Sequence, residues 1–484
     1  MKLRPLGVII FFLLGAAFAL AWAWRRQQSL ARYRNLIPRV SMERVEPAVA
    51  RRIDSLAGIV RNRPLAAEAW GELGKALHIH QFQGAAVACY RQAAELDKHA
   101  WPWRYLLAMA LQTLGRDDEA LEAYAGCLAL KGDYAPIPVR LGQVLAGMGR
   151  MPAAEAAFQA ALRLGGAEYP ARIGLAQTSM AAGNWIAARE HLDKARAFAP
   201  DGAEAVTLLA EYHLRRGEVG KAGELRSLAA GMHSNGPMPD SVADSLVAAG
   251  VSSFWLEHKG RQAQARGRYE PAAMHFRAAL SQKPAPGTFN LLAGALLNLG
   301  RTDEAVSVLQ DATERFPAAA ELWNSLGGAY SVQNRPEQAI VGFGRALQAD
   351  SASLQAYLNL GQLYISLGRS REAIELFRDA RRRNPADPNL MRMLALALVT
   401  DDRREPKALR EALELAAKAA ADTGFKDPLA MDVLASAYAT SGRFHEAKET
   451  QFRALQLISR DGNSGLIASF SERLASYQAM AGAP

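Results

Sequence analysis

A small residue recurs at a fixed interval along the first half of this 484-residue chain. Alanine stands every 34 residues, at Ala86, Ala120, Ala154, Ala188 and Ala222. A second series has the same phase one helix earlier, each member directly after a leucine: Gly74, Ala108, Gly142, Ala176 and Ala210. Two series in phase predict two helices per repeat that pack closely, because larger side chains would hold the helices apart. We therefore expect a chain of repeated helix pairs.

The segment AEAWGELGKAL (67–77), followed by Ala86, Tyr90 and Ala93, has the Trp, Leu-Gly, Ala, aromatic order of the tetratricopeptide repeat (TPR). In this region the chain resembles TPR proteins. After an interruption the pairs of small residues resume, with Gly260, Ala293, Gly327, Gly361, Ala395 and Ala435 on first helices and Ala272, Ala305, Ala339, Ala373, Ala412 and Ala447 on second helices. The resemblance implies an all-α, right-handed α-solenoid of about eleven helix pairs.

An isolated repeat cannot bury its apolar face, so a stack of repeats needs a cap at each end. The Gly, Pro, Asn and Ser residues around 231–240 are typical of a loop, and the repeat phase is lost there. This joint either lies within one kinked solenoid or is a hinge between two solenoids. The expected order is a basic head (1–5), a transmembrane helix or signal segment (6–24), a basic linker (25–45), an N-terminal capping helix (46–66), a first TPR block (67–230), the joint (231–252), a second TPR block (253–460) and a C-terminal capping helix and tail (461–484).

Residues 6–24 are uncharged and nearly all apolar, and their number is close to the ~20 residues that a membrane-spanning helix needs. Trp22 and Trp24 lie at the end of this segment, where interfacial aromatic residues are common. We expect a single-pass anchor with the repeats on the extracytoplasmic (periplasmic) side, because a short basic head before an apolar stretch is typical of export signals. A cytoplasmic repeat domain, or a cleaved signal and a secreted protein, are the alternatives.

Composition narrows the classes of function. The net charge of +9 is spread along the chain and does not form one basic stripe with interleaved aromatic residues, which disfavours nucleic acid as a partner. The two cysteines, Cys89 and Cys127, indicate packing positions and no disulfide framework. No phosphate-binding loop, H-E-x-x-H, G-x-S-x-G or Cys-x-x-Cys motif occurs. His78 and His80 are two residues apart and would point to different sides of a helix. We expect no enzyme, metal site, cofactor or small-molecule substrate.

In TPR proteins the first helices line a concave groove, so the resemblance implies that polar residues near each Leu-small pair face it. An amide has both a donor and an acceptor and can bind an extended peptide backbone without demanding a sequence. An amphipathic helix is the alternative ligand, and each polar residue could instead be merely solvated. The candidate partner-binding residues are Lys75, Gln143, Gln177, Glu211, Asn290, Asn324, Asn359 and Gln362.

Two functions are compatible with these features. The first is a membrane-anchored TPR scaffold or adaptor that holds a protein or peptide partner in its groove, in a bacterial envelope assembly or biogenesis process, as the resemblance to anchored TPR proteins implies. The second is a non-catalytic accessory subunit that presents substrate to a separate enzyme, such as a glycan- or cytochrome-maturation enzyme. The sequence does not name the partner.

Overall fold

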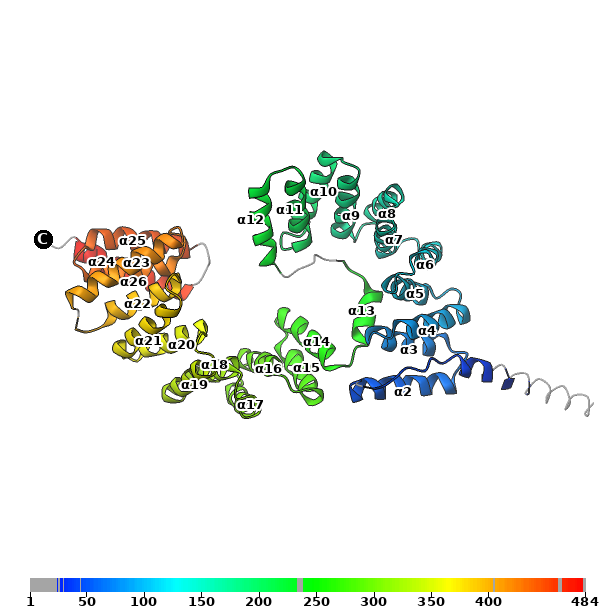
Figure 1. The fold of residues 1–484 in the computed structure, drawn as a ribbon, viewed down its shortest axis with the longest axis horizontal. Helices are drawn as coiled ribbons and strands as arrows, with labels where there is room; N and C mark the ends of the chain where they lie inside the picture. The colour runs from blue at the N-terminus through cyan, green and yellow to red at the C-terminus, as the bar shows by residue number, and fades with distance from the viewer. Residues whose placement is uncertain are drawn as a thin grey trace, which may run out of the picture. The chain divides into compact units, whose positions relative to one another are not determined.

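The structure is a computed structural model that describes residues 24, 27–28, 30–43, 45–232, 238–403, 405–459 and 464–481. These residues form α-helices joined by short turns, with no strand element among them (Figure 1). The chain divides into two compact units, unit 1 (Met1–Trp255) and unit 2 (Leu256–Pro484). Each unit is a helical solenoid built from antiparallel helix pairs, as the repeat pattern predicts.

In unit 1, α2 (Pro47–Asn62) precedes the helix pairs, packs on α3 and buries Val49, Ile53 and Val60. Five helix pairs follow, and a short helix then lies outside the pairing. The pairs are α3 (Ala67–Ile79) with α4 (Gln83–Leu96), α5 (Trp101–Thr113) with α6 (Asp117–Leu130), α7 (Pro136–Gly147) with α8 (Met151–Leu164), α9 (Glu168–Ala181) with α10 (Trp185–Phe198) and α11 (Ala203–Arg215) with α12 (Val219–Ala230). The short helix is α13 (Ser241–Ala248).

Helix α14 (Ser253–Ala265) begins in unit 1 and continues into unit 2, where it starts the second series of pairs. The last helix, α26 (Ser464–Ala481), packs on α25 and buries Phe470. Between them lie α15 (Tyr269–Gln282), α16 (Pro286–Asn298), α17 (Thr302–Arg315), α18 (Ala320–Val332), α19 (Pro336–Ala349), α20 (Leu354–Ser366), α21 (Ser370–Arg383), α22 (Pro388–Thr400), α23 (Pro406–Asp422), α24 (Pro428–Thr440) and α25 (Phe444–Ile458).

The small residues of the two sequence series lie where paired helices touch. A Cβ atom on Gly327 would stand 2.6 Å from the Phe343 ring, and one on Gly74 would stand 2.7 Å from the Tyr90 ring. Real Cβ atoms do not come that close to a neighbour, so only glycine lets the aromatic ring of the second helix lie against the first. Gly115 has φ +68°, a left-handed conformation that glycine adopts at low cost, and it ends α5.

Consecutive first helices of the pairs contact one another in both units, for example α7 with α9 and α18 with α20, whereas consecutive second helices make fewer contacts. The first helices therefore lie on the tighter side of each solenoid. We call the surface formed by the first helices of a unit its inner face, and the surface formed by its second helices its outer face.

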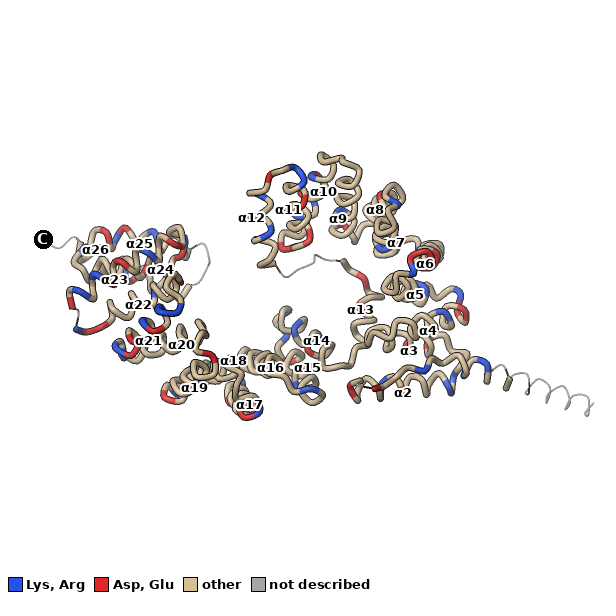
Figure 2. Tube along the Cα trace, in the orientation of Figure 1, with Lys and Arg blue, Asp and Glu red and all other residues tan. Residues whose placement is uncertain are grey.

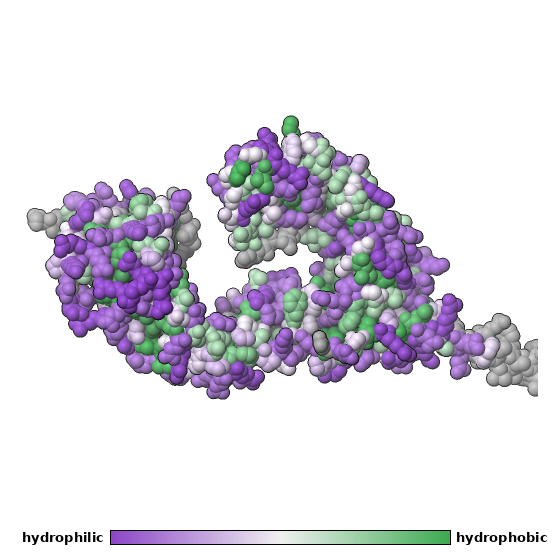
Figure 3. Space-filling model, in the orientation of Figure 1, coloured by the Kyte–Doolittle hydropathy of each residue, from purple (hydrophilic) through white to green (hydrophobic). Residues whose placement is uncertain are grey.

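Positions of Lys and Arg and positions of Asp and Glu are interspersed along the trace of each unit (Figure 2). In the space-filling view the hydrophobic residues gather in small areas between hydrophilic ones (Figure 3). This agrees with the expectation that charge is spread along the chain.

The predicted membrane segment, residues 6–24, lies outside the described residues except for Trp24. Within the part of the chain that the structure describes, we find no helix with the length and apolar character needed to cross a bilayer. The anchor therefore stays a prediction from the sequence.

Candidate polypeptide-binding faces

The inner face of unit 1 holds a segment of its own chain. Helix α13 packs against the first helices α3 and α5 and lies inside the arc that α2 to α12 form (Figure 1). Its Val242 and Leu246 are buried in the same hydrophobic cluster as the core of these repeats. We call residues 240–255, which include α13, the plug.

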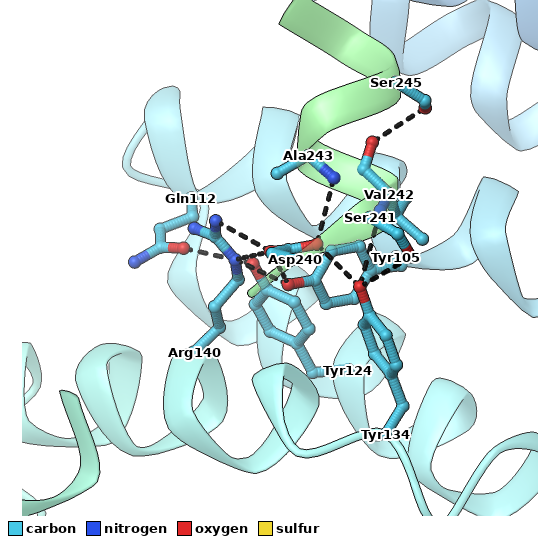
Figure 4. A network of polar contacts seen from close by, with 10 residues as sticks. All are labelled: Tyr105, Gln112, Tyr124, Tyr134, Arg140, Asp240, Ser241, Val242, Ala243 and Ser245. Atoms are coloured by element: carbon cyan, nitrogen blue, oxygen red, sulfur yellow. Dashed lines mark hydrogen bonds and ion pairs between the residues drawn. The ribbon is translucent and has the colours of Figure 1, made fainter. Parts of the chain in front are cut away.

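The plug begins at Asp240, whose side chain is only 3% exposed. The Tyr105 hydroxyl donates to Oδ2 of Asp240 at 2.6 Å, and the Tyr134 hydroxyl donates to Oδ1 at 2.9 Å. Nη2 of Arg140 donates to Oδ2 at 3.1 Å and completes an ion pair. Figure 4 shows these side chains converging on the carboxylate. We call Tyr105, Tyr134 and Arg140 the carboxylate cradle.

Asp240 is also the N-cap of α13, because its Oδ1 accepts a hydrogen bond from the backbone N–H of Ala243 at 2.9 Å. Such a cap satisfies one of the unpaired donors at a helix start. Both carboxylate oxygens thus have donors from the groove or from α13 itself. A buried carboxylate needs this degree of pairing to offset the loss of water.

The cradle keeps its protons under ordinary conditions. Burial raises the pKa of Tyr105 well above its usual value; the charge of Arg140 opposes this and that of Asp240 adds to it. Burial alone would lower the pKa of Arg140, but the nearby Tyr105, Tyr124 and Asp240 outweigh it and raise that pKa. Tyr105 therefore remains a hydrogen-bond donor and Arg140 remains a cation, which suits the cradle to a carboxylate.

The other end of the plug is fixed near the start of unit 1. The backbone N–H of Ser253 donates to Oε2 of Glu46 at 2.7 Å, and its hydroxyl donates to Oε1 at 2.6 Å. Nε1 of Trp255 donates to the carbonyl of Ile79 at 3.0 Å. The plug therefore crosses α7, α5 and α3 and reaches the N-cap of α2.

His78 lies under this region. Its side chain is buried, whereas a polar residue on a helix surface would be solvated. Burial, followed by the positive charge of Arg140, lowers the pKa of His78 from 6.5 to about 4. Its Nδ1 is 3.5 Å from the Tyr90 hydroxyl. His78 is therefore neutral near neutral pH and belongs to the core beneath the cradle.

In unit 2, two of the predicted amides meet on the inner face. Nδ2 of Asn359 on α20 donates to Oδ1 of Asn324 on α18 at 3.0 Å, and Nε2 of Gln355 donates to Oδ1 of Asn359 at 2.8 Å. Oδ1 of Asn290 is buried and has no hydrogen-bond partner, and Gln362 is exposed. Gln355 extends the set that the sequence had indicated. The result is a row of amides across adjacent first helices.

The predicted residues of unit 1 lie on first helices but do not form such a row. Lys75 pairs with Glu72 and lies over the Trp103 ring, and Glu211 pairs with Arg215. Gln143 and Gln177 are exposed. Within the described residues, no hydrogen bond or ion pair joins these four candidates to one another.

The sequence patterns did not reveal the cradle and the plug. Asp240 followed by a short apolar helix is a recognisable N-cap signal, and it could have indicated α13. Its contacts reach 100 residues back to Arg140 and 135 residues back to Tyr105, beyond any local pattern. The sequence therefore indicates that α13 is a helix, but it does not indicate where α13 packs.

Surface cavities lie on the outer faces of the described repeats. One of about 580 Å³ lies between α17 and α19 over α18 and is lined by Trp323, Leu326, Tyr330 and Val341. Cavities of about 350 and 380 Å³ take the equivalent places over α5 and α11. Because the same hollow recurs between successive second helices, it is a property of the repeat and does not by itself mark a ligand site.

No group of three or more His, Cys, Asp or Glu side chains in the described part of the chain is placed to hold a metal ion. Cys89 and Cys127 are both buried free thiols. Burial raises the pKa of each thiol to about 12, so neither forms a thiolate readily.

Comparison with known families agrees with the fold. Tetratricopeptide repeat profiles match residues 104–134, 145–212, 290–353 and 333–397. The chain carries tetratricopeptide repeats. TPR arrays are in general non-catalytic scaffolds for protein–protein interaction, with an extended concave surface for the partner.

Two curated relatives and one solved structure illustrate the similarity. The chain is 26% identical over 276 residues to the Protein CTR9 homolog of Arabidopsis thaliana, covering 55% of this chain and 24% of that one. It is 24% identical over 197 residues to the TPR repeat-containing protein YpiA of Bacillus subtilis (strain 168), covering 41% and 45%. The chain thus spans less than half the length of both relatives. A tetratricopeptide repeat protein from Parabacteroides merdae ATCC 43184 matches at 15% identity and a TM-score of 0.36, covering 47% of this chain and 100% of that one.

Proposed function

We propose that this chain is a non-catalytic TPR scaffold that binds a protein or peptide partner along the inner face of unit 2. The observation that carries the proposal is the bonded pair of Asn324 and Asn359 on adjacent first helices. In this pair the Oδ1 of Asn324 is the acceptor, which leaves the amide N–H groups of Asn324 for a ligand. Such groups suit the alternating donors and acceptors of an extended backbone.

Photo-crosslinking in the native cell tests this binding face. A photoreactive amino acid at Gln362, exposed on the inner face, should crosslink to a partner, and the same group at Gln338, exposed on the outer face, should not. The label at Gln362 reports on the inner face and the label at Gln338 reports on the outer face. Comparing the two adducts therefore shows which face the partner contacts. Adducts at Gln338 alone would place the partner on the outer face.

Replacing Asn290, Asn324, Asn359 and Gln362 by alanine should weaken the adduct that the partner forms with a photoreactive group at Glu321, an exposed residue of α18 outside the amide set. A matched variant replaces four exposed polar residues of second helices by alanine: Ser307, Gln338, Gln348 and Glu375. Exposed polar substitutions seldom change stability by more than about 0.5 kcal/mol, so the matched variant should remain folded. The three asparagines are only partly exposed, so circular dichroism checks that the four-amide variant is folded. Equal loss of the adduct in both variants would count against the amides as the binding groups.

The proposal includes an anchor at residues 6–24 and a place in a bacterial envelope assembly or biogenesis process. The uncharged apolar run between basic residues supports the anchor, since its length suits one membrane crossing. The repeat domain is then periplasmic. Full-length protein should stay with membranes through alkaline washing, whereas a chain that starts at Val45 should be released.

Reporter fusions after Arg34 test the orientation separately. A reporter that works only outside the cytoplasm should be active there. Activity of a cytoplasm-only reporter would reverse the orientation, and a mature N-terminus at Trp22 or Trp24 would show a cleaved signal.

A further inference from the structure

The plug makes the inner face of unit 1 different from an empty groove. We propose that this face is a second polypeptide-binding site, closed by the plug, and that its partner presents an acidic residue at the start of a short amphipathic helix. The proposal rests on the contacts of Asp240 and does not depend on the partner of unit 2.

The contacts of the plug show which chemistry the face recognises. The carboxylate cradle takes an acidic side chain, and a basic side chain at that place would face the cation of Arg140. Two apolar side chains on the same side of α13, Val242 and Leu246, enter the hydrophobic cluster. A matching partner segment therefore has Asp at the N-cap and apolar residues two and six positions later.

A segment of another polypeptide can replace the plug on the inner face. Helix α13 has eight residues, and helices shorter than about 12 residues are marginal in water, so α13 depends on the inner face for its order. Its polar contacts with the cradle select an acidic residue and fix the register of the helix. The plug nevertheless has the advantage of being linked to its site, which raises its effective concentration.

A different protein is a better occupant than a second copy of this chain. A second copy would donate an identical plug, so an exchange between copies would form the same contacts that it breaks. Such an exchange would add no contact at the cradle. The plug of the same chain would also remain at a higher effective concentration than a plug from another copy. A partner with further contacts along the inner face can outcompete the plug.

The test uses the full-length protein and a labelled synthetic peptide of residues 238–255 as the probe. Asp240→Ala removes the carboxylate, and Asp244→Ala removes an exposed carboxylate from the same helix as the matched control. In Asp240→Ala, amide hydrogen exchange of residues 241–255 should speed up by at least about tenfold, because a buried contact is lost. The same variant should bind the peptide at least about tenfold more tightly than the parent and Asp244→Ala do.

Adding Arg140→Met to Asp240→Ala should abolish the gain in peptide binding, because the cradle no longer offers a cation. If Asp240→Ala proves poorly folded by circular dichroism, Glu46→Gln loosens the other end of the plug without leaving the cradle unpaired. It should also increase peptide binding and exchange at residues 250–255.

Three results would overturn the proposal: a plug that stays protected in both variants, a released plug whose site does not take the peptide, or a dimer in the parent that Arg140→Met dissociates. The last would mean that a second copy supplies the segment. Peptide binding should be unchanged in the four-amide variant of unit 2, so failure here and failure of the unit 2 site are distinguishable.

Discussion

The inner faces of the two units use the same backbone to present opposite kinds of surface. In unit 1 a buried carboxylate, two tyrosines and an arginine hold a segment of the chain itself. In unit 2 the amides of Asn324 and Asn359 bond to each other across adjacent first helices.

The comparison shows that the TPR frame does not decide what its inner face does. The Leu-small pairs set how closely the helices approach, and the residues beside them decide the chemistry. A buried ionic network is costly to break because each partner left behind is uncompensated. A row of partly exposed amides is cheap to change because water replaces the lost bonds. Substitutions in the two units should therefore differ in their effect on stability.

Removing the cation of the cradle should have the largest effect. Arg140→Met keeps much of the side-chain volume but leaves the buried Asp240 carboxylate without its cation, and breaking a buried ion pair costs about 3–5 kcal/mol. We expect unit 1 to lose about 3 kcal/mol of stability in urea unfolding, or the plug to be released at a similar cost.

Arg172→Met is the control for this substitution. Its side chain is 18% exposed, the same as that of Arg140, but it pairs with a partly exposed Glu168 on the same helix. Pairs of that kind contribute about 0.3–0.5 kcal/mol. Similar losses for the two variants would show that the cradle is no more than an ordinary surface pair.

Filling the close helix contact that both units share should have the next largest effect. Gly327→Ala in unit 2 and Gly74→Ala in unit 1 each drive a methyl group into an aromatic ring and should cost about 1–3 kcal/mol. Gly328→Ala has open space around its new Cβ and should be neutral or stabilise by up to about 1 kcal/mol. Thermal unfolding of the three variants checks this; a tolerated Gly327→Ala would mean that the Phe343 ring moves aside at little cost.

Acidification should weaken unit 1 through His78. The folded-state pKa of about 4 lies below the ordinary 6.5, so the unfolded chain binds more protons between these values and stability falls as the pH falls. For one such group the loss between about pH 7.5 and about pH 5.5 is about 1.4 kcal/mol. His78→Gln removes this proton uptake, so its stability should fall less over the same range. Parallel pH profiles for the parent and His78→Gln would contradict the assigned shift.

The helix pairs could be predicted because their cause is local and repeated. Gly74 and Gly327 belong to series of small residues that recur at the repeat period, so each repeat indicates the same close contact. The meeting of Asn324 with Asn359 follows from the same period, since residues at equivalent positions of neighbouring repeats lie side by side.

The plug could not be predicted because the contacts that hold it are neither local in sequence nor repeated. Asp240 contacts Arg140 across 100 residues and occurs once, in a stretch whose composition is typical of a loop. The burial that makes His78 and Tyr105 unusual depends on that contact and on helices from several repeats. Polarity along a first helix therefore indicates the inner face but does not tell whether a segment already covers it.

The smallest expected effect tests whether the amides of unit 2 form a fixed row or respond to solvent independently. A double-mutant cycle uses Asn324→Ala, Asn359→Ala and the double variant, with the free energy of unfolding from urea titration. The two side chains are partly exposed, so the coupling energy should be no more than about 0.5 kcal/mol, below the net value of about 0.5–1.5 kcal/mol for a typical intramolecular hydrogen bond. A coupling near zero would leave both amides free to turn toward a partner, whereas a coupling above about 1 kcal/mol would show a rigid pair whose bond a partner has to break. In that second case the inner face of unit 2 would resemble the closed face of unit 1, and the contrast between the two units would be one of degree.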